Sequence, residues 1–77
     1  MTRDYAKSEL AIENNFTYHK PINDQPIRYE QLRNKAKELA LLMDDYCPPS
    51  REKSLAFTKL EEVIMWANAS IARNEVV

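Results

Sequence analysis

The fold is decided by Cys47–Glu75, which reads CPPSREKSLAFTKLEEVIMWANASIARNE. Pro49 followed by Ser50 is a strong helix start signal, and Glu52 places a negative charge in the first turn, where it suits the helix dipole. Apolar residues then recur every three or four positions, as on one face of a helix. They form a complete packing stripe, namely Phe57, Leu60, Ile64, Ala67 and Ile71, reinforced by Ala56 and Val63. The stretch therefore predicts one long amphipathic helix.

A second stripe lies about 180° around the same helix. Its members are mostly small or apolar: Leu55, Thr58, Glu62, Met65, Ala69, Ala72 and Arg73, flanked by Trp66. A solvated face would be mostly charged, and a helix that is apolar on both sides is usually buried on both sides. We therefore expect this face to contact other protomers in a homo-oligomer of closed symmetry.

Two further helices are expected upstream. A short helix should cover Asp4–Glu13 and stop at Asn14-Asn15, and FTYHKP, Phe16–Pro21, should follow as an extended strap because it alternates aromatic residues and closes on proline. Another helix should begin near Pro26 with Asp24 as its cap. Its apolar stripe is Leu32, Ala36, Leu39, Met43 and Tyr46.

These elements predict an all-α fold, in which a short N-terminal helix precedes a two-helix antiparallel hairpin. We expect residues 1–77 to form a single helical domain. A chain of 77 residues makes a marginal core, and its single cysteine cannot form an internal disulfide. Cys47, beside Pro48-Pro49, is interpreted as a small buried hydrophobe. Oligomerisation is the remaining source of stability.

Composition argues against most enzyme classes. The chain has no glycine for a phosphate-cradling loop, and its one histidine cannot build a common zinc site. We therefore expect no catalytic residues, no cofactor and no metal. A net charge of −1 argues against binding to DNA, and the absence of a signal-peptide core or a long apolar run argues against a membrane. A cytosolic protein is expected.

The charge is nevertheless unevenly distributed. Residues 16–37 contain five basic and two acidic side chains, which leaves a local charge of +3 suited to a small anion. Tyr18 is either an aromatic cover for the core or a stacking platform for a base. Arg33 and Lys37 either serve one anion or pair with Glu30. Arg73 needs either Glu62 of a neighbouring chain or a ligand anion.

The segment Phe16–Glu75 resembles a known phage family. FTYHKP, DQPIRYEQLRNKAKELA and CPPSREKSLAFTKLEEVIMWANASIARNE together are similar to the anti-CBASS cyclic-oligonucleotide sponges, whose hairpin domain is shared with a Thoeris anti-defence protein. The resemblance covers about three quarters of the chain and is most specific in SREKSLAFTKLEE and MWANASIARN. It implies a small helical homohexamer in the host cytoplasm that sequesters cyclic di- and trinucleotides without cleaving them.

The same resemblance implies two binding sites. Tyr18 would stack on a base of a cyclic dinucleotide and Arg33 would meet its phosphates, with His19 and Lys37 nearby. Which of Arg33, Lys35 and Lys37 makes the main phosphate contact stays open, because the three lie within about one helical turn of each other. A separate cyclic trinucleotide site would lie where protomers converge, at Arg73 with Ala69 one turn before. The alternative function is a small helical adaptor that binds a host protein through the second stripe and remains a monomer until then.

Overall fold

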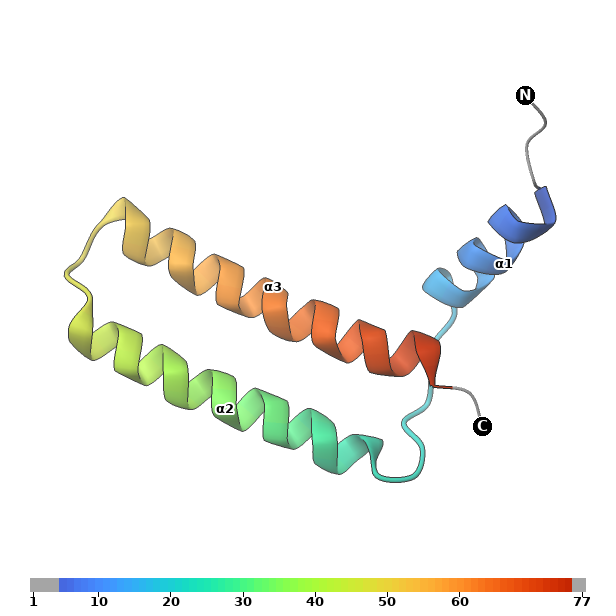
Figure 1. The fold of residues 1–77 in the computed structure, drawn as a ribbon, viewed down its shortest axis with the longest axis horizontal. Helices are drawn as coiled ribbons and strands as arrows, with labels where there is room; N and C mark the ends of the chain where they lie inside the picture. Colours follow the sequence, from blue (N-terminus) through green and yellow to red (C-terminus); the bar gives the residue numbers. More distant parts are fainter. Residues whose placement is uncertain (1–4, 76–77) are drawn as a thin grey trace.

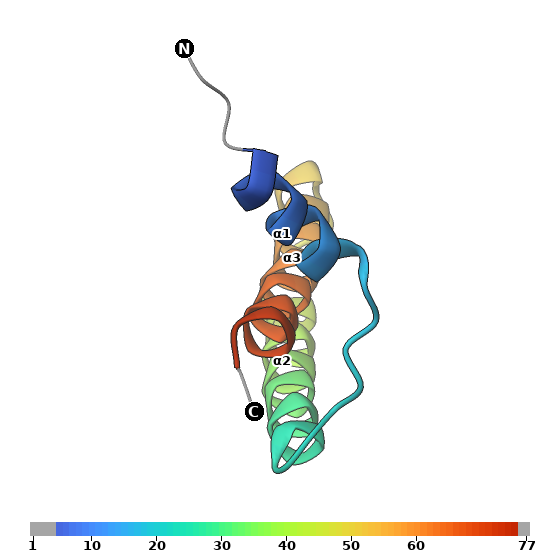
Figure 2. The same cartoon turned by 90° about the vertical axis from the view of Figure 1, so that its right-hand side faces the viewer.

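Three helices make up the described part of the chain, residues 5–75, in the computed structural model of the protein (Figure 1). They are α1 (Tyr5–Phe16), α2 (Gln25–Tyr46) and α3 (Arg51–Asn74). α2 and α3 run antiparallel and pack side by side, and none of residues 5–75 lies in a strand (Figures 1 and 2). The predicted all-α fold with a two-helix hairpin is therefore confirmed.

The start of α3 is as the sequence predicts. Ser50 is the N-cap, its side chain accepts a hydrogen bond of 3.1 Å from the backbone N–H of Lys53, and Glu52 lies in the first turn. Cys47, which precedes Pro48, is extended at φ −98° and ψ 126° because a proline disfavours helical backbone in the residue before it. These local effects end α2 and begin α3 within a few residues. The Cys47 side chain is half-buried.

The start of α2 differs from the prediction in one detail. Asp24 is the N-cap, but its side chain makes no capping hydrogen bond. Its backbone lies at φ −90° and ψ 6°, outside the extended region from which a cap side chain normally reaches back to the helix N–H groups. The carboxylate instead pairs with Arg28 at 3.1 Å, one turn further on. The capping position was right and the capping bond was wrong.

α1 is longer at its C-terminal end than predicted. Asn14 and Asn15 were expected to stop the helix, yet it continues to Phe16, so the strap without regular structure is residues 17–24. The reason is a tertiary contact, because the Asn14 side chain donates a 3.0 Å hydrogen bond to the backbone carbonyl of Arg73 in α3. Asp4, where the predicted helix began, lies outside the described residues. α1 otherwise stands away from the hairpin (Figure 1).

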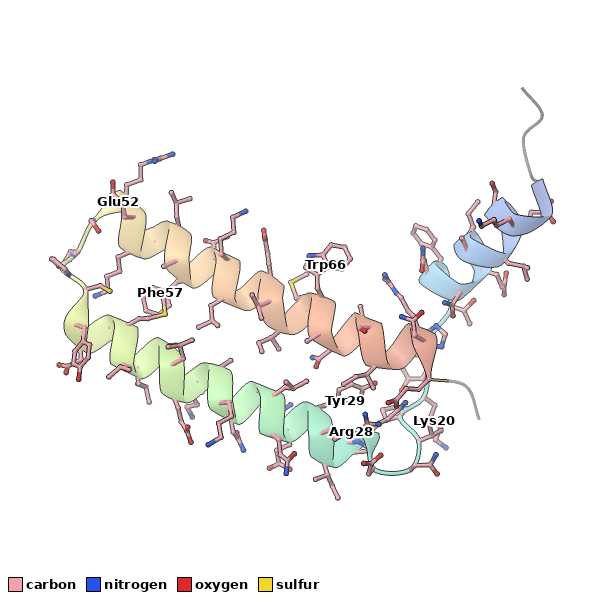
Figure 3. All side chains as sticks on the ribbon, in the orientation of Figure 1. Lys20, Arg28, Tyr29, Glu52, Phe57 and Trp66 are labelled. Carbon is pink, nitrogen blue, oxygen red and sulfur yellow. The ribbon has the colours of Figure 1, made fainter. Side chains whose placement is uncertain are left out.

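The hairpin encloses no core. Among residues 7–75 no hydrophobic side chain is buried, although Phe57 lies between α2 and α3 as predicted (Figure 3). The molecule is 15 Å thick along its shortest axis, little more than one helix diameter. A single layer of helices cannot surround a side chain, and domains normally need two packed layers. Every predicted packing residue is therefore at best half-buried.

Three predicted packing residues are exposed. Leu39 is 46% exposed, Val63 is 58% exposed and Tyr46 is 74% exposed, because the facing helix is too narrow to cover the borders of either stripe. On the opposite side of α3, Met65 and Trp66 are 65% and 66% exposed, and Trp66 points away from α2 (Figure 3). The outer face of α3 therefore presents apolar side chains to solvent, as the second stripe predicted.

Candidate anion-binding groove

A groove of about 490 Å³ lies at the open end of the hairpin, a volume in the usual range for small-molecule sites. Tyr29 in α2 lies between the two long helices at this end (Figure 3). All three helices and the strap contribute to the lining of the groove. The lining residues are Asn15 from α1, Thr17, Tyr18 and His19 from the strap, Tyr29 and Arg33 from α2, and Asn68, Ala69, Ala72 and Arg73 from α3. The groove thus depends on how the strap crosses the helix ends.

The groove has an uncompensated positive charge. Among the described residues, it is lined by two arginines and by no acidic residue. Within residues 5–75 no carboxylate forms an ion pair with Arg33, Lys37 or Arg73, and Glu30 pairs with neither of the first two. Lys35 differs, because its ammonium lies 3.3 Å from Glu38. Two unpaired guanidinium groups in one hollow favour a ligand that carries several negative charges.

His19 fixes one end of the strap. Its Nε2 lies 2.7 Å from the backbone carbonyl of Asn14, and a carbonyl only accepts, so Nε2 carries a hydrogen and donates it. The ring is half-buried. Tyr18, the residue before it, is 81% exposed. The interpretation of Tyr18 as a cover for the core is therefore wrong, and its ring faces are available to a ligand.

A clasp formed by Gln25, Arg28 and Glu75 fixes the other end of the strap. Gln25 is 3% exposed; its Oε1 accepts from the Ile22 N–H at 3.1 Å and its Nε2 donates to Glu75 at 2.8 Å. Arg28 donates through both terminal nitrogens to the same carboxylate, at 2.7 and 2.5 Å. The hydrogen bonds from Arg28 and then Gln25 lower the pKa of Glu75 from 4.5 to about 2, and the bond to Glu75 raises the pKa of Arg28.

The chain reverses direction between these two anchors. Asn23 has a left-handed backbone, with φ 52°, in the turn that leads into α2. Asparagine adopts this conformation more readily than other non-glycine residues, which matters in a chain without glycine. The strap is thus held at His19, turned at Asn23 and tied to the end of α3 through Gln25. Its path places Tyr18 beside the arginines.

Five of the six predicted site residues line this one groove. Tyr18, His19 and Arg33, predicted for the dinucleotide, share it with Ala69 and Arg73, predicted for the trinucleotide. Within a protomer the two predicted sites are therefore adjacent.

Lys37 is the predicted residue that does not line the groove. It borders a neighbouring hollow of about 320 Å³, where it accompanies Arg33, Phe57 and Glu61. Lys35 lines a third hollow, away from Tyr18. Arg33 is therefore the best placed of the three candidate phosphate contacts.

Sequence reasoning missed Tyr29 and Asn68, which also line the groove. Tyr29 precedes Arg33 by one turn, so helical spacing could have placed both on one side of α2. Asn68 interrupts a run of small and apolar residues beside Ala69, which was a usable signal. The Gln25–Glu75 contact was also missed, because it depends on the register between α2 and α3.

The sequence of the chain matches a family described as Acb2/Tad1, hairpin domain, over residues 8–72. The chain belongs to this family. The Acb2/Tad1 hairpin proteins are the anti-CBASS and anti-Thoeris sponge family, so the resemblance noted from the sequence is confirmed. The match takes in most of α1, the strap, all of α2 and nearly all of α3, and Arg73 lies one residue beyond it. No curated protein and no solved structure matches the chain.

Two further findings concern residues 5–75. None of the helices there has the length and apolar character needed to span a bilayer. The same residues contain no cluster of three or more His, Cys, Asp or Glu side chains arranged to hold a metal ion.

Proposed function

We propose that the protein is a phage anti-defence sponge, which binds cyclic di- and trinucleotide messengers of bacterial CBASS immunity in the host cytoplasm and withholds them without cleavage. Membership of the Acb2/Tad1 hairpin family supports this function. The observation that carries it is the groove itself, in which an exposed tyrosine ring lies with two unpaired arginines and no carboxylate. An aromatic face and fixed positive charge are complementary to a base and its phosphates.

For a cyclic dinucleotide, Tyr18 stacks on one base and Arg33 donates to a phosphate. His19 holds the strap through its bond to Asn14 and so positions Tyr18. Lys37 lies one turn beyond Arg33 and adds positive charge at the edge of the ligand. A guanidinium can donate two parallel hydrogen bonds to a phosphate, which fixes orientation as well as adding affinity.

For a cyclic trinucleotide, Arg73 meets the phosphates where the third helices of several protomers converge. Ala69, one turn earlier, is small enough to let neighbouring backbones approach. The proximity of Arg73 to Tyr18 in one groove means that the two ligand sites would be neighbours in the assembly. Several copies of Arg73 brought together repel, and an anionic ring would relieve that repulsion.

The proposed assembly is a homohexamer built on the outer face of α3. The protomer leaves Leu55, Met65 and Trp66 exposed, and none of the hydrophobic side chains among residues 7–75 is buried. Burying apolar surface between protomers supplies stabilisation that a single layer of helices lacks. The same exposed face also suits the alternative function, a helical adaptor for a host protein.

One experiment separates these functions. The purified protein is incubated with a panel of cyclic di- and trinucleotides, passed through a desalting column, heated, and the released ligand is analysed by chromatography. The Tyr18→Ala, Arg33→Ala double variant is the control for retention in the groove. Ligand that is retained and recovered intact supports a sponge. Linear products would indicate a phosphodiesterase, and no retention by a monomeric protein would favour the adaptor.

A further inference from the structure

Asn68 is the polar residue of the groove whose hydrogen bonding the fold does not explain. Its Oδ1 is shielded from solvent and accepts no hydrogen bond within residues 5–75. Among those residues the other shielded atom of this kind is Nε of Arg28, whose guanidinium is already bonded to Glu75 through both terminal nitrogens. Asn68 has no comparable compensation.

A leucine of similar volume would fill this position without the free-energy cost of an unpaired amide oxygen. An amide oxygen removed from water without a partner is unfavourable, and replacing such a group by an apolar one of similar shape is close to neutral or stabilising. Natural structures contain few such groups, and each calls for a reason. The torsion that orients an asparagine amide is broad, so Asn68 can turn its amide toward a ligand that supplies the missing partner.

The other polar side chains of the groove are either already hydrogen-bonded, open to water, or suited to another part of the ligand. The Thr17 hydroxyl donates to Glu13 at 3.1 Å, and Asn15 is exposed, so water can satisfy its amide before a ligand arrives. Arg33 carries charge and suits a phosphate of the dinucleotide, while Arg73 is assigned to the trinucleotide. Tyr18 offers a ring face, and the Tyr29 hydroxyl is not among the shielded atoms that lack a partner. These groups account for the phosphates and the face of a base, and they leave the edge of the base unread.

A carboxamide offers one acceptor and two donor hydrogens, which match the N6–H and N7 of adenine in a two-bond pairing. The corresponding edge of guanine presents two acceptors, O6 and N7, so the amide oxygen would stay without a partner there. We propose that Asn68 reads the adenine edge of a cyclic nucleotide bound in the groove and gives the groove a preference for adenine over guanine. This inference rests on the proposed function.

The test compares Asn68→Leu with the wild-type protein by calorimetry, using cyclic di-AMP and cyclic di-GMP as ligands. The wild type should bind cyclic di-AMP more tightly, and the ratio of the two affinities should fall roughly five- to hundredfold in the variant, as for loss of a bidentate base contact. Asn74→Leu is the matched control, because Asn74 is an exposed amide on the same helix that bonds to the Ser70 carbonyl. Its affinity ratio should equal that of the wild type.

A melting curve without ligand distinguishes base reading from a structural role. Asn68→Leu should melt at or above the wild-type temperature, because it removes a shielded oxygen that has no partner. A variant that melts lower and keeps the wild-type affinity ratio would assign Asn68 to stability and overturn the inference. The inference would also be overturned if Asn68→Leu weakened the binding of both ligands equally, or if the wild type preferred the guanine ligand. If the wild type binds neither cyclic dinucleotide, the proposed function fails first, which is a separate outcome.

Discussion

Replacing Tyr18 by alanine should weaken cyclic dinucleotide binding while leaving the fold unchanged. The ring is 81% exposed in the protomer, so its removal takes away little packing. Exposed substitutions of this kind usually change the free energy of unfolding by no more than about 0.5 kcal/mol. The effect on binding is larger, because stacking of a base on an aromatic ring is worth about 1–3 kcal/mol.

That free energy converts to a roughly five- to hundredfold increase in the dissociation constant, since about 1.4 kcal/mol corresponds to a factor of ten. Tyr18→Phe should keep most of the affinity, because stacking needs the ring and not the hydroxyl. Tyr46→Ala is the matched control, because this tyrosine is similarly exposed, at 74%, and lies at the opposite end of α2. It should bind as the wild type does.

The assay is isothermal titration calorimetry with one cyclic dinucleotide, supported by far-UV circular dichroism and sedimentation velocity on each variant. The last two measurements exclude unfolding and loss of assembly as causes. Tyr18→Ala with wild-type affinity would refute the stacking role. An equal loss in Tyr46→Ala would show that the effect does not come from the groove.

Three further outcomes are expected. Ala69→Arg should bury charge between protomers, so the protein should sediment as smaller species while it stays helical, and an unchanged sedimentation coefficient would place the interface elsewhere. Arg73→Ala should abolish cyclic trinucleotide binding with little effect on the dinucleotide, and Tyr18→Ala should do the reverse; equal loss of both ligands in both variants would mean one shared site. Glu75 should stabilise the protein fully above pH 4.5 and progressively less as the pH falls toward its folded pKa of about 2. Urea unfolding of Glu75→Gln should therefore show a deficit at neutral pH that closes over that range, and a constant deficit would contradict the ion pair.

The helices of the hairpin could be predicted because their signals are local. Ser50 needs only the N–H of Lys53 to cap α3, and Cys47 needs only Pro48 after it to leave the helix. The missing capping bond of Asp24 also has a local cause, in its backbone angles and its ion pair with Arg28. The error at the end of α1 came from a contact between distant segments. Asn14 extends α1 because it meets the end of α3, and no spacing within α1 announces that partner.

The sequence pointed to some of the residues that line the groove, but not to their arrangement. Tyr18, Arg33 and Arg73 were singled out by residue type and by the family resemblance, but their meeting in one groove depends on the helix register and the path of the strap. Asn68 interrupts an apolar run, but the sequence alone does not show whether its amide has a hydrogen-bond partner. Its lack of a partner becomes visible only when neighbouring atoms are placed around it.

The anchors of the strap have a consequence for the order in which the molecule forms and opens. The α2–α3 turn closes over a few residues, whereas the Gln25–Glu75 and Asn14–Arg73 bonds join positions 50 and 59 residues apart. Contacts with greater sequence separation carry a larger loop-closure entropy and form later. The hairpin should zip from its turn toward the groove, and local opening should begin at the groove. Amide hydrogens of the strap and the last turn of α3 should thus exchange fastest in the free protein, and a bound ligand should slow those more than any others.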